Sequence, residues 1–311
     1  MSETKKLDAI QLEMLKQVAD LHSVPEGAYS LRINGQLHGK NSSEHITIEK
    51  KEDVSGIDII IAPETKNESL HIPVILSQAG IREVVYNDFH IGENCDVTIV
   101  AGCGIHNGGT ETSEHSGIHR FFVGKGAKVK YVEKHYGSGE GTGERVMNPT
   151  TEVHMAEDSY MEMETAQIKG VDSTVRRTTA TLEDRATLII HEKIMTHGTQ
   201  YAETYFEVDM NGEDCGAHVV SRSVAKDQSR QKFVSHVNGN SRCSGHTECD
   251  AIIMDDANVI AIPEISANHT EASLIHEAAI GKIAGEQLIK LMTLGLSEKE
   301  AEEQIINGFL K

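Results

Sequence analysis

Alternating hydrophobic and polar residues dominate the middle of the chain. Short runs such as HITIEK, DVTIVAG, ATLIIHEKI and AHVVSRSV are rich in β-branched residues and are separated by Gly, Asn and Asp. A period of two places successive side chains on opposite faces of a strand. We therefore predict many short strands between about Tyr29 and Ile265.

A weak repeat underlies these strands. Its turn-plus-strand units recur at intervals of roughly 26 to 32 residues, the range typical of solenoids. The units begin near Gly92, Gly124, Ala156, Leu182, Asn211 and Gly239. The pattern predicts a mainly β fold, a right-handed parallel β-helix. A β-sandwich is the alternative, but a sandwich usually has more aromatic residues than the 4% found here and clearer two-residue turns.

Both ends of the chain have helical spacing instead. Residues 7–21 repeat apolar positions every three or four residues and predict a short N-terminal helix. After Ile265 the period changes to 3.6, and we expect helices over Thr270–Leu294 and Ser297–Ile306. Ser297 and Glu300 form a capping-box pattern, while Gly295 is expected to end the first of these helices and Gly308 the second. The expected domains are residues 1–28, 29–265 and 266–311.

Composition narrows the classes of partner. The formal net charge of −19 over 311 residues would repel a polyanion, so we expect no nucleic-acid partner. We see no apolar run long enough for a transmembrane helix and no signal peptide, and expect no membrane partner and a cytoplasmic location. Five cysteines in such a chain favour reduced thiols over a disulfide framework.

Two cysteine arrangements suggest metal chemistry. The segment CSGHTEC offers Cys243, His246 and Cys249, and a zinc-binding hydrolase is one alternative function. An extended strand would separate Cys243 from Cys249 by about 20 Å, so this site needs a turn at Ser244-Gly245. Cys215 precedes Cys243 by about one repeat, so these two thiols could lie on successive coils. They could hold iron jointly, with two thiols from each protomer of a symmetric dimer.

The segment from Cys243 to Lys282 resembles the SufB/SufD family of iron–sulfur cluster assembly scaffolds. It has a Cys-Asp pair (Cys249-Asp250), a short strand ending near Pro263, and an HEA sequence that begins at His276. The resemblance extends over roughly residues 20–309, and the chain looks like a minimal, SufB-like form of the scaffold.

The resemblance implies a set of site residues. Cys249, Glu277 and His276 are expected to form a transient iron–sulfur cluster at a protomer interface, with Cys215 and Cys243 as candidates to complete the ligands. Gly102-Cys103 matches a family Gly-Cys pair at which sulfur arrives as a persulfide. The following residues, from Gly104 onward, differ from the family's Thr-Ala-Pro.

The resemblance also implies partners. A SufC-like ABC ATPase is expected to dock on residues 266–311, the chain is expected to form a homodimer through its C-terminal region, and a sulfur donor and apo-protein recipients complete the system. Gly281-Lys282 lacks the upstream glycine of a Walker A motif, so we expect a non-catalytic scaffold. A purely structural β-helix that polymerises through its open ends is the remaining alternative.

Overall fold

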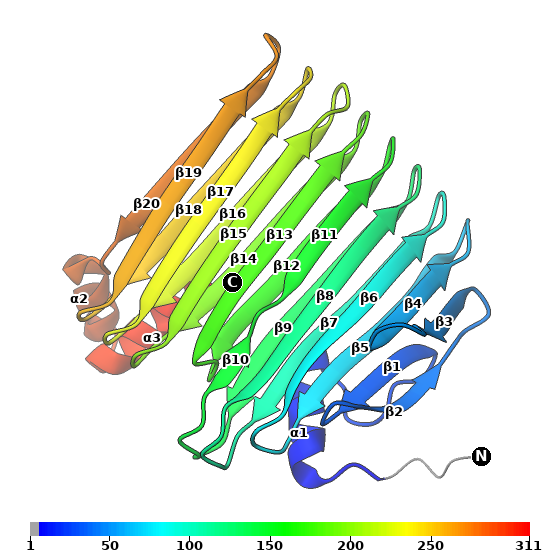
Figure 1. The fold of residues 1–311 in the computed structure, drawn as a ribbon. Coiled ribbons are helices and arrows are strands. Elements are labelled where there is room, and N and C mark those ends of the chain that lie inside the picture. The colour runs from blue at the N-terminus through cyan, green and yellow to red at the C-terminus, as the bar shows by residue number, and fades with distance from the viewer. Residues whose placement is uncertain (1–5) are drawn as a thin grey trace.

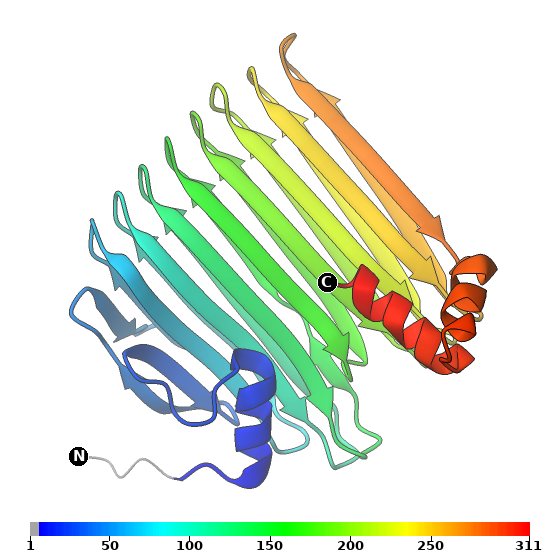
Figure 2. The ribbon, with the colours of Figure 1, turned by 180° about the vertical axis from the view of Figure 1, so that it is seen from behind.

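Two ten-stranded sheets lie face to face and run the length of the molecule (Figures 1 and 2). The computed structural model describes residues 6–311. Sheet A contains, in spatial order, β2 (Gln36–Asn41), β1 (Ala28–Ile33), β5 (Lys66–Leu76), β7 (Asp96–His106), β9 (Lys128–Ser138), β12 (Tyr160–Lys169), β14 (Thr187–Thr196), β16 (Gly216–Ala225), β18 (Ser244–Ile253) and β20 (Ser273–Gly281).

Sheet B is the opposing layer. In spatial order it contains β19 (Asn258–Ala267), β17 (Arg230–Gly239), β15 (Tyr201–Met210), β13 (Ser173–Leu182), β10 (Arg145–Met147) together with β11 (Thr150–Met155), β8 (Ser113–Val123), β6 (Arg82–Ile91), β4 (Gly56–Ile61) and β3 (Ile46–Lys50). The chain alternates between the sheets, so each coil adds one strand to each layer. Neighbouring strands are parallel from coil to coil, while β1 with β2 and β3 with β4 are antiparallel. The β-solenoid prediction is confirmed, and the sandwich alternative is wrong.

Alternation of side chains builds the core between the sheets. In β14 and β15 every second residue is buried, as the period of two predicts. The interior is mostly aliphatic and methionine side chains, with Phe89 stacked on Phe121 of the next coil at a ring-centroid distance of 4.3 Å. Like residues therefore stack above one another, which compensates for the low aromatic content.

The turns explain the repeat seen in the sequence. Asn94, Gly126, Asp158 and Asp214 occupy corresponding turns of different coils, and each has a left-handed φ between 55° and 65°. Glycine, Asn and Asp tolerate this conformation better than other residues. The repeat in the sequence therefore reflects the left-handed backbone conformation needed at each turn, rather than a repeated set of core residues.

The predicted N-terminal helix is confirmed as α1 (Ala9–Ala19), which begins with a capping box at Asp8. It packs on the outer face of sheet A over β7. A Cβ atom at Gly102 would lie only 2.5 Å from the carbonyl oxygen of Val18, and one at Gly104 would lie 3.1 Å from the Met14 sulfur. These glycines flank Cys103 because the helix needs a flat surface there.

The C-terminal region corrects one prediction. The helix expected over Thr270–Leu294 is wrong for its first half, because Ser273–Gly281 forms β20 and only α2 (Gly285–Thr293) is helical. The exposed edge of β18 offers backbone hydrogen bonds to the arriving chain, and this tertiary template overrides the local helical spacing. Gly295, at φ 99°, follows α2 as predicted.

The last helix agrees more closely with the sequence. Helix α3 (Glu298–Phe309) begins with the predicted capping box between Ser297 and Glu300, but it continues through Gly308 to Phe309. The helix lies across the outer face of sheet A (Figure 2). On its apolar side Ile306 and Leu310 pack with Val224. Helical structure at this end therefore occupies 285–309, and strands extend well beyond Ile265.

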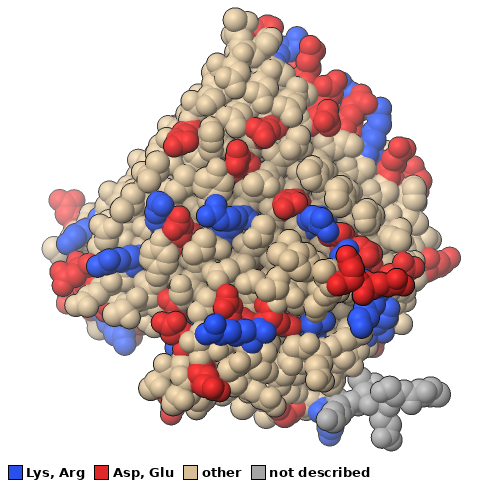
Figure 3. Space-filling view, viewed as in Figure 1, with Lys and Arg blue, Asp and Glu red and all other residues tan. Residues whose placement is uncertain are grey.

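Among the described residues, no helix is long and apolar enough to cross a membrane. Basic and acidic side chains lie next to one another on the face seen in Figure 3. Many of them form pairs between adjacent coils, such as Lys232 with Glu203 at 3.0 Å. Such a pair joins charges of opposite sign on neighbouring parallel strands.

Candidate functional site

Cys249 lies in β18, one coil from the C-terminal end of the solenoid. Its side chain faces the interior, is 1% exposed, and has Ser221 of β16 and Ala278 of β20 as register neighbours. Burial, with a smaller contribution from the negative charges of Glu192 and Asp250, raises the pKa of the thiol to about 12. A metal ion that binds here must therefore displace the thiol proton.

His276 and Glu277 point in opposite directions because they are consecutive residues of a strand. His276 Nδ1 lies 2.6 Å from Thr247 Oγ1, an inward-facing hydroxyl. Its Nε2 is shielded from solvent and has no hydrogen-bond partner among residues 6–311. Burial and then the nearby His246 lower the pKa of His276, so its imidazole is neutral. Glu277 is on the outer face, 65% exposed, with Oε2 3.4 Å from His246 Nε2. Of the expected trio, the fold puts Cys249 and His276 on one face and Glu277 on the other.

Cys215 and Cys243 form a separate buried pair. They directly precede Gly216 and Ser244, which are register neighbours, so the predicted one-coil spacing is confirmed. Burial and the neighbouring Cys243 raise the pKa of Cys215 to about 11. The five proposed ligands therefore do not form one group within the chain.

The alternative prediction of a zinc site in the segment CSGHTEC is wrong. Ser244 and Gly245 belong to the extended strand β18 rather than to a turn. Cys243 and Cys249 are consequently about 20 Å apart along the strand. His246 faces outward while Cys249 faces inward, so the three side chains cannot share one ion.

Cys103 lies in β7, several coils away from Cys249. It faces the interior beside His135 of β9 and Val74 of β5. Burial, with Glu83 and Glu133 nearby, raises the pKa of Cys103 well above its usual value. A cavity of about 10 Å³ borders it, enough for roughly one water molecule.

A buried polar network fills the interior between these two cysteines. Arg176 forms an ion pair with Glu133, and its Nε lies 3.7 Å from Oε1 of Glu192. Arg176 Nη2 also lies 3.3 Å from His135 Nδ1. Ser221 donates to Glu192 at 2.8 Å. His135 is the register neighbour of Cys103, and Ser221 is the register neighbour of Cys249, so polar side chains connect the two thiols.

The charges in this network are set by their surroundings. Burial opposes ionisation of Glu133, but Arg176 and His135 outweigh it and hold the pKa of that carboxyl well below its usual range. Burial is the larger influence on Glu192 and raises its pKa. Our sequence analysis missed this network. Its signal was present, because Glu133, Arg176 and Glu192 occupy strand positions where the alternation predicts apolar residues.

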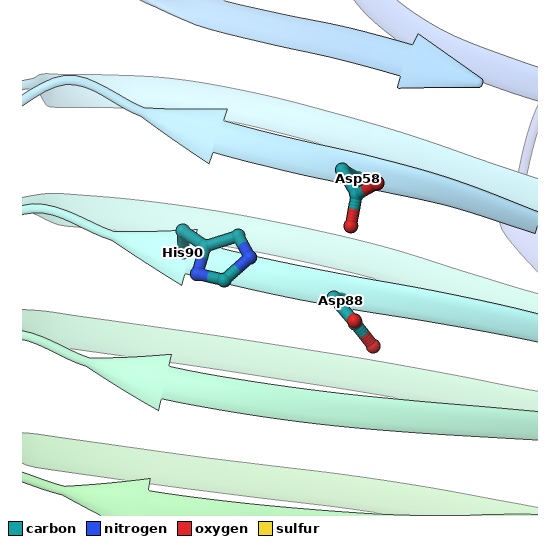
Figure 4. A group of neighbouring side chains, drawn as sticks. All are labelled: Asp58, Asp88 and His90. Carbon is teal, nitrogen blue, oxygen red and sulfur yellow. The ribbon is translucent and has the colours of Figure 1, made fainter. Parts of the chain in front are cut away.

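An acidic cluster on the outer face of sheet B has no free capacity for a metal ion. Figure 4 shows Asp58 on β4 near Asp88 and His90 on β6. Lys51 Nζ lies 2.5 Å from an oxygen of Asp58 and 2.8 Å from one of Asp88, and Arg120 donates twice to Asp88. Both carboxylates are thus already neutralised by the chain's own cations.

The last coil, β19 and β20, is covered by no other strand of the described chain. Large apolar side chains are between 39% and 54% exposed there, namely Ile260, Ile262, Ile265, Ile275 and Ile280. Helix α2 also exposes apolar residues, with Ile289 at 62%. The N-terminal end is different, because β2 and β3 pair antiparallel with β1 and β4 there.

Comparison with known proteins agrees with this architecture. Residues 79–309 match the family described as SUF system FeS cluster assembly, SufBD core domain. An iron–sulfur cluster assembly SufBD family protein from Archaeoglobus fulgidus is 30% identical over 279 residues, covering 88% of this chain and 72% of its own length. A relative of the same description from Methanothermobacter thermautotrophicus is 29% identical, and the matched region spans only 57% of its length.

A bacterial relative matches over a shorter segment. The iron–sulfur cluster assembly protein SufB of Bacillus subtilis is 35% identical over 97 residues, which cover 30% of this chain and 21% of that protein. The family match covers most of the chain, including the coils that carry Cys103 and Cys249. This chain belongs to the SufBD family of iron–sulfur cluster assembly proteins.

Proposed function

We propose that this chain is a non-catalytic scaffold on which a labile iron–sulfur cluster is assembled between two copies of the protein. The observation that carries the proposal is that Cys249 and His276 face the interior next to an uncovered, apolar end of the solenoid. The cluster is cargo here, formed and then released to a recipient protein. A neutral imidazole and one thiol per chain provide few permanent ligands, which suits release.

A symmetric dimer would complete such a site. The exposed isoleucines of the last coil are the apolar surface expected of an interface, and the free backbone groups of β19 and β20 need partners. A twofold axis would bring Cys249 and His276 of both copies to one interface. Cys243 precedes β18 and Cys215 precedes β16, one coil earlier, and the two remain candidates for a second pair of thiols, while Glu277 lies on the outer face.

The ATPase partner is proposed to dock on the C-terminal segment, residues 266–311. Ile289, Met292 and Leu294 are 42% to 76% exposed on and just after α2. Nucleotide-driven closure of a SufC-like ABC ATPase there would pull on β20 through the short connection to α2. Movement of β20 would uncover Cys249, because Ala278 lies directly over it.

Cys103 is proposed to accept sulfur. The Cys103 thiolate would attack the outer sulfur of a donor persulfide, and the donor cysteine would leave as a thiolate, so no external oxidant is needed. Its register neighbour His135, whose pKa is lowered chiefly by burial, is a neutral imidazole. The polar network between Cys103 and Cys249 supports placing both thiols in one function. The cation of Arg176 in this network would stabilise a persulfide anion in the buried interior of the solenoid.

Anaerobic iron–sulfide reconstitution tests the cluster site. We expect Cys249→Ser to abolish the visible chromophore and the bound iron and sulfide, while Cys103→Ser keeps them because free sulfide bypasses sulfur delivery. Cys95→Ser is the matched control, since Cys95 is also buried but donates to a backbone carbonyl in the N-terminal coils. A cluster that forms equally well in Cys249→Ser would refute the assignment.

The dimer and the ATPase contact need separate tests. Ile265→Glu with Ile280→Glu should give monomers by light scattering, whereas Ile168→Glu, at an exposed site away from the last coil, should not. Ile289→Asp should weaken binding of a SufC-like ATPase in calorimetry, while Ile10→Asp on α1 should leave it unchanged. Dimers that persist in the first variant, or ATPase binding that survives the second, would contradict these contacts.

A further inference from the structure

One coil of sheet B is interrupted. Its two segments, β10 and β11, are separated by Asn148 and Pro149, which belong to neither strand. The strands on either side, β8 and β13, run past this point without a break. The register to β8 is the same before and after the interruption, because three residues separate the paired positions on each strand. Asn148–Pro149 therefore replaces two ordinary strand residues and is not an insertion.

Pro149 removes a backbone hydrogen bond from the middle of sheet B. The N–H of Arg177 donates to the carbonyl of Pro149 at 3.0 Å, as in a regular parallel ladder. Two residues earlier on β13, the carbonyl of Val175 would accept from the nitrogen of residue 149 in the same ladder, but a proline nitrogen carries no hydrogen. Proline is normally confined to edge strands and bulges for this reason. The ladder is therefore weakened at Val175.

Asn148 bridges the weakened position with its side chain. Its Oδ1 accepts from the N–H of Val175 at 3.0 Å, and its Nδ2 donates to Glu114 of β8 at 3.2 Å. Side-chain hydrogen bonds thus hold the coil together where the backbone ladder is incomplete. These bonds can break without unfolding a whole strand, so Asn148–Pro149 is a segment that can open locally.

The interior cavity beside Cys103 extends to this segment. Pro149 on sheet B and Cys103 on sheet A both line the cavity of about 10 Å³. Gly117 of β8 lines it too, at an inward-facing position where a Cβ atom would lie 3.1 Å from His119 Nε2. The absence of a side chain at Gly117 keeps this part of the interior open. Local opening of Asn148–Pro149 would therefore connect Cys103 with solvent.

The opposite face of this coil is covered. Helix α1 packs over β7 on the outer face of sheet A, and a Cβ atom at Gly102 would lie 2.5 Å from the carbonyl oxygen of Val18. Both α1 and α3 lie on the face seen in Figure 2, which is the side of sheet A. A molecule approaching Cys103 from that side would have to displace α1. The interruption in sheet B is the route with less cover.

We propose that Asn148–Pro149 is a gate through which the terminal sulfur of a cysteine persulfide reaches Cys103 from the outer face of sheet B. The inference rests on the proposed role of Cys103 as sulfur acceptor and adds the route to it. The bond between the Cys103 sulfur and the transferred sulfur forms as the donor's S–S bond breaks, and the donor leaves as a thiolate. The donor protein must therefore present its persulfide over β10 and β11, on the sheet that carries no helix at this point.

Labelling of Cys103 by methyl methanethiosulfonate, followed peptide by peptide in a mass spectrometer, tests the gate in the full chain. Pro149→Val supplies the missing N–H and should slow the labelling about fivefold, the factor expected when one more backbone hydrogen bond must break for local opening. Asn148→Ala removes the bridging hydrogen bonds and should accelerate the labelling. Cys95, another buried thiol, reports general unfolding in the same samples and should be unaffected. Pro263→Val is the matched control, because it replaces a proline in β19 of the same sheet, remote from Cys103.

A Cys103 labelling rate that neither variant changes would overturn the proposal. A parallel change at Cys95, or an equal change in Pro263→Val, would also overturn it, because the thiol would then be reached by general unfolding.

Transfer from glutathione persulfide, measured as the persulfide of Cys103, separates the gate from the acceptor role. Slower transfer in Pro149→Val supports both. Transfer at the wild-type rate in Pro149→Val would refute the gate and leave the acceptor role standing. A Cys103 that is labelled through the gate but never carries a persulfide would refute the acceptor role and leave the gate standing as an access route.

Discussion

The buried Glu133–Arg176–Glu192 triad gives the sharpest test of the interior network. Replacing Arg176 with Met keeps much of the side-chain volume but removes the cation that both carboxylates face. All three side chains are 4% exposed or less, so water cannot replace the lost charge. Breaking a buried ion pair by removing one partner costs about 3–5 kcal/mol. We expect a loss of that size in the free energy of unfolding at pH 8.

The loss should depend on pH in a defined direction. In the wild type the depressed pKa of Glu133 contributes stability above the unfolded-state pKa of about 4.3, and this contribution disappears as the pH falls. Without Arg176, burial raises the folded-state pKa of Glu133 above the unfolded value. Stability then decreases as the pH rises through that raised pKa. The difference between wild type and Arg176→Met should therefore be largest at pH 8 and shrink toward pH 5.

Denaturant unfolding followed by circular dichroism measures the effect, with hydrogen exchange of β12 to β14 as a local readout. Arg177→Met is the matched control, because Arg177 is the next residue of the same strand and faces outward over Tyr205. Adding Glu133→Gln to Arg176→Met should recover part of the loss. A cost below about 1 kcal/mol at pH 8, or the same cost in Arg177→Met, would refute the reasoning.

Three further predictions concern packing and capping. Phe89→Ala should cost about 3–5 kcal/mol in thermal or denaturant unfolding, because a fully buried ring in the stacked core is lost. Gly102→Ala should loosen α1 and cost about 1–3 kcal/mol, since its Cβ would collide with the Val18 carbonyl. Limited proteolysis near the N-terminus measures this, and Gly108→Ala, whose Cβ would meet only His106 Nε2 at 3.8 Å, should not change it. Ser297→Ala should destabilise α3 by about 1 kcal/mol, seen as faster amide exchange in that helix, and unchanged exchange would contradict the capping role.

Some predictions failed for a specific physical reason. The sequence from Thr270 to Gly281 has helical spacing, yet β20 forms because β18 presents an open sheet edge. The same strand geometry separates His276 from Glu277, which a helix would have kept closer to one face. Cys243 and Cys249 were separated by the extended backbone of β18, as the distance argument had anticipated.

The alternation of residues and the recurring turns were enough, by themselves, to determine the repeated strands, the solenoid and the one-coil spacing of Cys215 and Cys243. These features depend on local backbone preference and on a period of two, both of which are written along the chain. The sequence also identified Cys103 and Cys249 as candidate site residues through family resemblance, while the structure showed that both face the interior. Only the tertiary structure decided which side chains share the interior. The polar network depends on register between coils about thirty residues apart, and a shift of one residue would reverse every side chain.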